Sequence, residues 1–441
     1  MTVLERPAPP VRAAGRLDDV GFWLFVAGVL LACFAGHWDA LRVPVPLDRG
    51  LLLVGLLLEW GRARRDRRPV RIGTAAVLLV AGAVWTAVSF LGSPVRTADG
   101  AFFLLDLAVL PAVLFISAPL ILDTARRRFL FAAVFAVFGL YLGATAITQT
   151  LQLPALVFPA YILDPTVGIH ADRARGPYAE AVDNGVMLII SGALGGVVAA
   201  LAERRAWRVV GLAAVLLTAV GCALTLTRAI WFAGAAALLV GFLLTPALRR
   251  RAIGVGAGAA VAVALFPLLF PGFGEAASTR GGDESPIWDR LNVNAAAGRM
   301  LMHDPLFGVG WNQAGERMSE FVRLGGDYPV TAASATLIPH NVFLGRFAEL
   351  GVLGGSLWLA GVLAALVAPA LRRARPGFGP WRVALLACAV AWVVVANFGP
   401  VNYSQPAYLL AILGGVTASG AALPPTAHDW RPRRTRGAHR G

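Results

Sequence analysis

The chain has 441 residues, of which 57% are hydrophobic and only 15% are charged. Soluble domains average about 25% charged residues, so this composition excludes a soluble cytosolic enzyme, a disulfide scaffold and a disordered chain. The net charge of +14 comes from 39 basic and 25 acidic residues, and every one of the 39 is arginine. Because these arginines flank apolar runs, we expect a membrane protein in a lipid bilayer with no nucleic-acid partner.

Twelve apolar runs approach the length of about 20 residues that a transmembrane helix needs. They lie near residues 20–36, 44–61, 72–92, 102–122, 129–150, 184–202, 209–226, 229–248, 252–271, 342–368, 383–399 and 407–423. The second run and the last two are short or interrupted by glycine and proline. The sequence therefore predicts an all-α polytopic membrane protein with about twelve transmembrane helices.

Arginines at alternate connections orient these helices, because positive charge is retained on the cytoplasmic side. The connections that we assign to the cytoplasm hold 27 arginines and eight acidic residues, whereas the rest of the chain is slightly acidic. Both termini are expected in the cytoplasm. The predicted organisation is a cytoplasmic segment over 1–19, nine helices over 20–271 with an external loop at 151–183, a large external loop over 272–341, three helices over 342–423 and a cytoplasmic arginine-rich tail over 424–441.

The large loop over 272–341 is too long to be a simple turn, since connections above about 15 residues are usually functional or disordered. It contains Trp288, Phe307, Trp311 and Phe321. We expect these side chains to bury a small core of their own.

The sharpest motif is His340-Asn341, followed nine residues later by Gly351-Val352-Leu353-Gly354. His340 is expected at the external mouth of a helix, where it can reach both water and a membrane-bound substrate, and histidine suits proton transfer near neutral pH. Gly351 and Gly354 would form a smooth helix face for close packing. The alternative is a capping histidine above a common packing motif.

This motif resembles the histidine-plus-GxxG signature of the O-antigen ligase and polymerase family, which also has about twelve spans and a large external loop before that histidine. Three other stretches resemble family motifs: Thr227-Arg228 with Trp231, Arg290 followed by Pro305-Leu306-Phe307-Gly308-Val309-Gly310, and Arg175-Gly176-Pro177-Tyr178. The resemblance covers about Arg173 to Gly355. Thr227 stands where the family usually has serine, and Asn294 where it often has an aromatic residue.

The resemblance implies a glycosyltransferase of the cytoplasmic (inner) membrane that works on the periplasmic or external side without a metal or other cofactor. It would move a glycan from a polyprenyl (undecaprenyl) diphosphate carrier to an acceptor hydroxyl on a lipid or glycan. Arginine suits this donor, because its planar guanidinium binds phosphate oxygens in pairs. The residues implied are His340, Arg228 and Arg290 as catalytic, and Arg175, Arg299, Asn341 and Tyr178 as substrate-binding.

Each charged residue also has a structural interpretation. Arg228 would be a snorkelling anchor and Arg290 a solvated surface charge. Local ion pairs would hold Arg175, with Asp172, Glu180 or Asp183 as its partner, and Arg346, whose i,i+3 neighbour is Glu349. Arg299, Arg280 or His303 would take the role of Arg290 if that residue is not the one used. Asp106 lies alone in the fourth predicted span with no assigned role.

Two further functions stay open at this point. A ligase transfers the finished glycan to another molecule, whereas a polymerase joins one growing polysaccharide to a repeat unit, and both types share this layout. A transporter or flippase of lipid-linked sugars is the alternative from another class. Transporters place charged residues near the membrane midplane, whereas these residues are predicted at the external surface, which favours an enzyme.

Overall fold

The computed structural model describes residues 19–421, except residues 44, 71, 255–256, 259–260, 262–264, 267–269, 271–273, 275–284, 324–337 and 400–402. Regular structure in the described residues is helical, apart from one isolated β-bridge. The helices are α1 (Val20–Leu31), α2 (Leu47–Arg65), α3 (Thr74–Gly92), α4 (Ala98–Leu104), α5 (Leu110–Ile121), α6 (Ala125–Thr150), α7 (Ala181–Leu201), α8 (Arg205–Leu224), α9 (Arg228–Leu244), α10 (Pro246–Arg250), α13 (Ser285–His303), α14 (Met318–Phe321), α15 (Val342–Val362), α16 (Ala368–Leu371), α17 (Gly379–Ala396) and α18 (Ser404–Ser419).

Seven of the helices in the described part of the chain are long and apolar enough to cross a membrane, which confirms a polytopic all-α protein. They span Thr74–Gly92, Ala98–Ile121, Ala125–Thr150, Ala181–Leu201, Arg205–Leu224, Val342–Leu371 and Gly379–Ala396, and two shorter apolar helices cover Val20–Phe34 and Arg228–Leu244. Helix α2 forms at the second predicted span, but charged residues at both of its ends keep it out of this set. The ninth predicted span, 252–271, lies largely outside the described residues. The total of twelve therefore stays a prediction.

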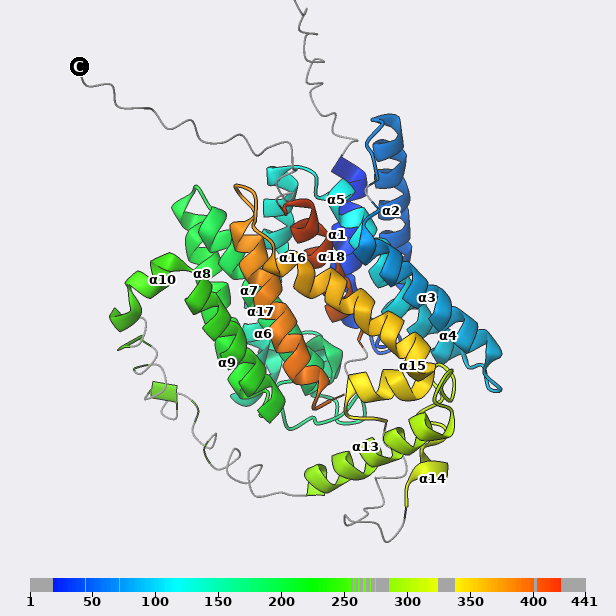
Figure 1. Cartoon of the computed structure of the whole chain (residues 1–441). Helices are drawn as coiled ribbons and strands as arrows, with labels where there is room; N and C mark the ends of the chain where they lie inside the picture. The colour runs from blue at the N-terminus through cyan, green and yellow to red at the C-terminus, as the bar shows by residue number, and fades with distance from the viewer. Residues whose placement is uncertain are drawn as a thin grey trace, which may run out of the picture.

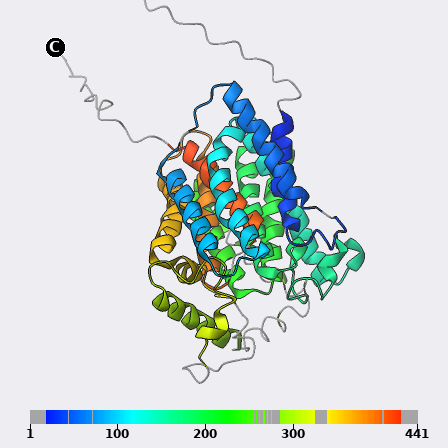
Figure 2. The same ribbon diagram turned by 90° about the vertical axis from the view of Figure 1, so that its right-hand side faces the viewer.

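The helices pack into a bundle in which α6, α7 and α8 contact one another, α9 packs on α17, α5 on α18 and α3 on α15. Helices α13 and α14 lie beyond one end of this bundle, the same end as the connection between α6 and α7 (Figures 1 and 2). At the opposite end, Arg127 forms ion pairs with Asp19 at 3.0 Å and Glu59 at 2.8 Å. The two predicted external loops thus share one end, while arginines predicted cytoplasmic gather at the other. Which end faces the cytoplasm stays a prediction.

Asp106 lies at the centre of a buried polar network inside the bundle. It is 3% exposed and sits in a π-helical turn, Leu105–Val109, between α4 and α5. Its carboxylate pairs with Arg49 of α2 at 2.5 Å and accepts hydrogen bonds from Ser404 at 2.7 Å and Tyr408 at 2.8 Å, both on α18. The network ties three helices together, because an unpaired charge in this environment would be costly.

The Asp106→Asn substitution is expected to destabilise the protein, because it leaves Arg49 without its counter-charge. Removing one member of a buried ion pair costs about 3–5 kcal/mol, and the side chain of Arg49 keeps 22% of its surface exposed, so we expect the lower end of that range. Thermal unfolding in detergent measures the effect. Glu320→Gln, which breaks the exposed Arg317–Glu320 pair, is the control and should change stability by less than about 0.5 kcal/mol. Equal melting temperatures for the two variants would contradict the assignment.

Candidate functional site

Arg228 is the first residue of α9 and lies half-buried at the tip of the tight turn between α8 and α9. The turn needs a left-handed backbone at Leu226, with φ of 50°. The indole of Trp231 closes it by donating a hydrogen bond to the carbonyl of Ala223, the residue before the last of α8, at 2.9 Å. The Thr-Arg-x-x-Trp pattern thus places Arg228 at the first position of α9, at the end of that helix nearest to α13.

The segment Pro305–Gly310 docks into a break in α15. Gly351 has φ of 68°, a left-handed backbone conformation that interrupts the helix and that favours glycine. The amides of Val309 and Gly310 donate to the carbonyls of Ala348 and Glu349 at 2.9 and 3.0 Å, and the amide of Val352 donates to Pro305 at 2.8 Å. The loop therefore satisfies the backbone groups that the break releases.

This arrangement corrects the expected role of Gly351. The sequence predicted that Gly351 and Gly354 both form a smooth packing face. Gly354 does so, since a Cβ there would overlap the indole of Trp85 in α3. Gly351 is instead the point where the helix breaks, and a Cβ there would overlap the backbone of Leu306. Two motifs far apart in the sequence, Pro305–Gly310 and Gly351–Gly354, are thus two halves of one contact.

The Gly351→Ala substitution is expected to lower stability by about 1–3 kcal/mol from backbone strain alone, with a further loss from the overlap with Leu306. Thermal unfolding in detergent micelles measures the change. Gly298→Ala is the matched control, because Gly298 lies inside α13 with no atom near its virtual Cβ, so alanine there should stabilise the helix by about 0.5–1 kcal/mol. If both substitutions changed the melting temperature in the same direction, the docking of Pro305–Gly310 into the break at Gly351 would be contradicted.

Helix α13 packs against the start of α15 through a small core of Val293, Ala296, Ala297, Met300, Val309, Ala314, Met318 and Ala348. The predicted core of the large loop therefore exists, but of the four predicted residues only Phe321 packs against this cluster, and its buried members are others. Trp311 is buried against the start of α4, where its indole donates to the carbonyl of Gly100 at 3.0 Å. The prediction was wrong for Phe307, which is 63% exposed and stacks on Trp85.

Arg290 lies on α13, three residues before the buried Val293 and therefore close to the face that packs toward α15. Burial lowers the pKa of Arg290 below its usual value, and the positive charge of Arg228 lowers it further. Among the described residues, neither guanidinium has an ion-pair partner. Two arginines whose positive charges repel each other form a site that a bound anion would stabilise.

His340 precedes α15 and lies within the electrostatic reach of Arg290. Its Nδ1 lies 2.9 Å from the carbonyl oxygen of Ile338, and since a carbonyl can only accept, Nδ1 is assigned the proton and Nε2 is the basic nitrogen. Burial lowers the pKa of His340 below 6.5, and the charge of Arg290 lowers it further, with Asp289 partly opposing this. His340 is therefore neutral, and able to accept a proton, at neutral pH.

The titration of His340 tests this coupling without reference to any reaction. Its folded-state pKa is lowered, so the neutral imidazole should persist to a pH below 6.5 and protonate only as the pH falls further. Arg290→Gln removes a nearby positive charge, so the pH at the midpoint of the His340 titration should move upward, toward 6.5. An NMR titration of the ring protons measures both, with Arg299→Gln as the control. A midpoint that does not move in Arg290→Gln would show that the two side chains are not coupled.

Asn341 has a structural role at this point. Its side-chain oxygen accepts a hydrogen bond from the amide of Leu344 at 2.9 Å and so caps α15, as asparagine commonly does at a helix start. Its amide nitrogen donates to Asn397, which follows α17, at 3.2 Å. Asn341 therefore holds the backbone that carries His340, and contact with a substrate would be an additional role.

Arg175 is completely buried, and its guanidinium is engaged by backbone carbonyls. It donates to Ile162 at 2.8 Å and Val167 at 2.6 Å, and also to Asp164 and Ile169. None of the acidic side chains considered from the sequence pairs with it. Burial lowers its pKa. This geometry gives Arg175 the role of organising the loop between α6 and α7.

Tyr178 is likewise a core residue, 1% exposed, whose hydroxyl donates to the side-chain oxygen of Gln405 in α18. Its carbonyl lies 2.9 Å from Nε2 of His37, which follows the first apolar helix. Burial raises the pKa of the Tyr178 phenol far above its usual value. Tyr178 thus anchors the α6–α7 loop to the bundle, and its side chain is not accessible to a substrate.

The alternatives to Arg290 lie elsewhere. Arg299 follows it by nine residues, about 13 Å along the helix and on the opposite face, and its Nε donates to the carbonyl of Phe321 at 2.7 Å. His303 is exposed and contacts Asp304 at 2.9 Å. Arg280 lies outside the described residues. Of the described candidates, Arg290 is the one whose charge is coupled to both Arg228 and His340.

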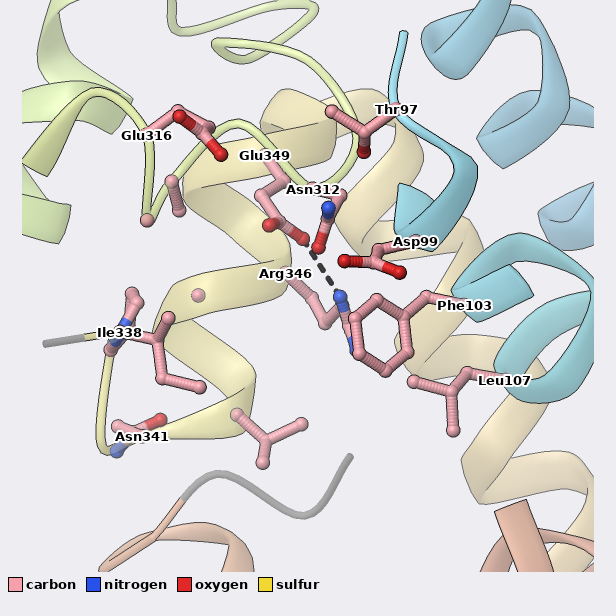
Figure 3. Close-up of a pocket in the computed structure, with 15 residues that line it drawn as sticks. Thr97, Asp99, Phe103, Leu107, Asn312, Glu316, Ile338, Asn341, Arg346 and Glu349 are labelled. Carbon is pink, nitrogen blue, oxygen red and sulfur yellow. Dashed lines mark hydrogen bonds and ion pairs between the residues drawn. The ribbon is translucent and has the colours of Figure 1, made fainter. Parts of the chain in front are cut away.

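A cavity of about 480 Å³ opens against Pro339 and Asn341, the residues that flank His340, and it could not be predicted from the sequence. Its lining comes from four places in the sequence: Thr97, Asp99, Phe103 and Leu107; Asn312, Ala314, Gly315 and Glu316; Ile338, Pro339 and Asn341; and Val342, Gly345, Arg346 and Glu349 (Figure 3). Arg346 and Glu349 form the ion pair that their spacing allowed, at 2.7 Å. Asp99 and Glu316 belong to no motif, so only the fold could reveal them.

A comparison with known families agrees with the resemblance seen in the sequence. Residues 213–359 match the family described as O-antigen ligase. The matched segment begins within α8 and ends within α15, so it contains Arg228, Arg290, His340 and the Gly351 break. No match was found among curated proteins. Members of the matched family are membrane glycosyltransferases of the ligase or polymerase type.

Proposed function

We propose that this membrane protein, whose residues 213–359 match the O-antigen ligase family, transfers a glycan from a polyprenyl diphosphate carrier to an acceptor hydroxyl. The observation that carries the proposal is the convergence of Arg228, Arg290 and His340 at one end of the bundle, where the charge of one lowers the pKa of the next. This combination supplies two cations for a leaving diphosphate and one neutral base for an acceptor.

The bond that breaks joins the sugar C1 to an oxygen of the diphosphate. Negative charge develops on that oxygen, and Arg228 and Arg290 are placed to stabilise it because they have no carboxylate partner among the described residues. His340 accepts the proton of the acceptor hydroxyl at Nε2, and the acceptor oxygen forms the new bond to C1. The products are a free polyprenyl diphosphate and a glycosylated acceptor. The proposed reaction uses no metal or cofactor.

The proposed location is the external face of the cytoplasmic membrane. The arginine distribution supports this side, since the arginine-rich α2–α3, α5–α6, α7–α8 and α16–α17 connections lie toward the opposite end of the bundle from α13 and the α8–α9 turn, whereas α10 lies partway along one side (Figure 1). Arg228 begins an apolar helix, which puts its charge near the level where the headgroup of a lipid diphosphate would lie. A lipid-linked donor can then reach the site from within the bilayer.

We further propose the ligase type of reaction, in which one finished glycan is added to a lipid or glycan acceptor. The support is the sequence pattern His340-Asn341 with Gly351 and Gly354, which is more similar to that of the ligases. A polysaccharide polymerase, which would add repeat units to one growing chain, is the alternative and has the same donor chemistry.

The experiment incubates purified protein with a polyprenyl-diphosphate oligosaccharide and, in separate reactions, a lipid acceptor or a second lipid-linked repeat unit. Release of polyprenyl diphosphate together with a single added glycan supports the ligase. A ladder of products from the second acceptor identifies the polymerase. Absence of released diphosphate with both acceptors would overturn the proposed function.

A further inference from the structure

The cavity beside His340 has the size of a ligand site, since pockets for small molecules commonly measure about 300–1,000 Å³. It lies between the start of α4, the loop before α14 and the first turns of α15. Figure 3 shows the side chains of Asp99, Asn312 and Glu349 around the same open space, with the ring of Phe103 beside them. The cavity therefore combines an aromatic surface with several hydrogen-bonding groups.

The charged residues of the lining are mainly acidic. Asp99, Glu316 and Glu349 contribute carboxylates, and Arg346 is the one basic residue of the lining. The guanidinium of Arg346 pairs with Glu349 at 2.7 Å and lies over the ring of Trp311. The charges of Asp99 and Glu316 therefore remain in excess, and a diphosphate or another anion would be repelled here.

The position of the cavity relates it to the transfer reaction. Pro339 and Asn341, the two neighbours of His340 in the chain, both contribute to the lining. His340 itself is not a lining residue, so a molecule in the cavity would contact the two residues that flank it, whereas the diphosphate is proposed to bind at Arg228 and Arg290, which do not line the cavity either. The two substrates would approach the histidine from different sets of residues.

We propose that this cavity binds the acceptor, and that its acidic lining selects a neutral, hydroxyl-rich sugar over an anionic one. Carboxylate and amide oxygens of Asp99, Glu316 and Asn312 accept hydrogen bonds from sugar hydroxyls. The same carboxylates keep the anionic donor headgroup out, so the two substrates cannot exchange places. This inference rests on the proposed function for its biological meaning, but the binding itself does not depend on transfer.

The test measures sugar binding to the full chain in nanodiscs without donor. Saturation-transfer NMR compares methyl glucoside, a neutral probe, with methyl glucuronide, its carboxylate counterpart. We expect the wild type to bind the glucoside about tenfold more tightly, since each like charge at short range opposes the glucuronide. The double substitution Asp99→Asn and Glu316→Gln keeps the shape of the lining and should bring the ratio close to one. Glu320→Gln, outside the cavity, should keep the wild-type ratio.

Equal binding of the two probes by the wild type would overturn the proposal, as would no binding of the glucoside or a preference that survives in the double variant. These outcomes are separate from those of the transfer assay. If the wild type discriminates between the probes but releases no polyprenyl diphosphate, the assignment of the cavity stands and the proposed function is wrong. A wild type that transfers glycan without discriminating would reject the cavity alone.

Discussion

Replacing His340 with alanine is expected to lower the rate of glycan transfer by about 10²–10⁴-fold, the usual contribution of a general base. The reason is the assignment of Nε2 as the proton acceptor, which follows from the contact of Nδ1 with Ile338. Donor binding should be unchanged, because the two arginines stay in place. A single-turnover assay with saturating donor separates the chemical step from binding.

The matched control for this substitution is His303→Ala. His303 belongs to the same part of the fold, but it is exposed and contacts Asp304, so its loss should leave the rate within about twofold. The thermal stability of both variants should be close to that of the wild type, since neither ring belongs to a buried core. Transfer at the wild-type rate by His340→Ala would remove this residue from the reaction.

Neutralising Arg228 or Arg290 is expected to have the second large effect, a loss of about 10²–10³-fold in turnover for Arg228→Gln or Arg290→Gln. Arg228→Lys should stay impaired, because an ammonium is a point charge that cannot make two parallel hydrogen bonds to a diphosphate. If both arginines hold one diphosphate, the double variant should lose less than the product of the two single losses. Titration with a radiolabelled polyprenyl diphosphate measures donor affinity directly.

Arg299→Gln is the control for these two substitutions. Arg299 lies on the same helix as Arg290 but faces the other way, and its Nε is hydrogen-bonded to Phe321. Its loss should change donor affinity by less than about threefold. Donor affinity retained by Arg228→Gln and Arg228→Lys alike would show that Arg228 does not contact the diphosphate and would favour its interpretation as a membrane anchor.

Short-range features could be predicted from the sequence. The turn at Leu226–Arg228 follows from the end of one apolar run and the start of the next, and its position agrees with the structure. The Arg346–Glu349 pair follows from i,i+3 spacing within a helix. The all-α membrane fold follows from composition and apolar periodicity, because a lipid environment leaves few other ways to satisfy the backbone.

Features that depend on contacts distant in sequence could not be predicted. The guanidinium of Arg175 finds backbone carbonyls that only the folded loop brings together, so the carboxylates nearby in sequence were the wrong partners to consider. The partner of Asp106 is Arg49, 57 residues away. Gly351 could be identified as a small residue, but its left-handed conformation is stabilised by the docked Pro305–Gly310 segment.

The acidic cavity could not be predicted from the sequence either, because its charged residues are far apart in the chain. Asp99 lies at the start of α4, Glu316 precedes α14 and Glu349 lies in α15. Asp99 and Glu316 are more than 200 residues apart in the chain, and no spacing rule connects them. The coupling of Arg228, Arg290 and His340 was expected from the family resemblance, whereas the packing of α13 on α15 gives a physical reason for it.

The most direct test of the proposed glycan transfer measures both of its products in one vesicle experiment. The protein is reconstituted with a fluorescent polyprenyl-diphosphate glycan and the acceptor, and both the released polyprenyl diphosphate and the glycosylated acceptor are quantified. We expect equal amounts of the two products with the wild-type protein, and both formed at least about 10²-fold more slowly with His340→Ala. Movement of intact donor between the leaflets, with no diphosphate released, would contradict the proposed transfer and identify a transporter of lipid-linked sugars.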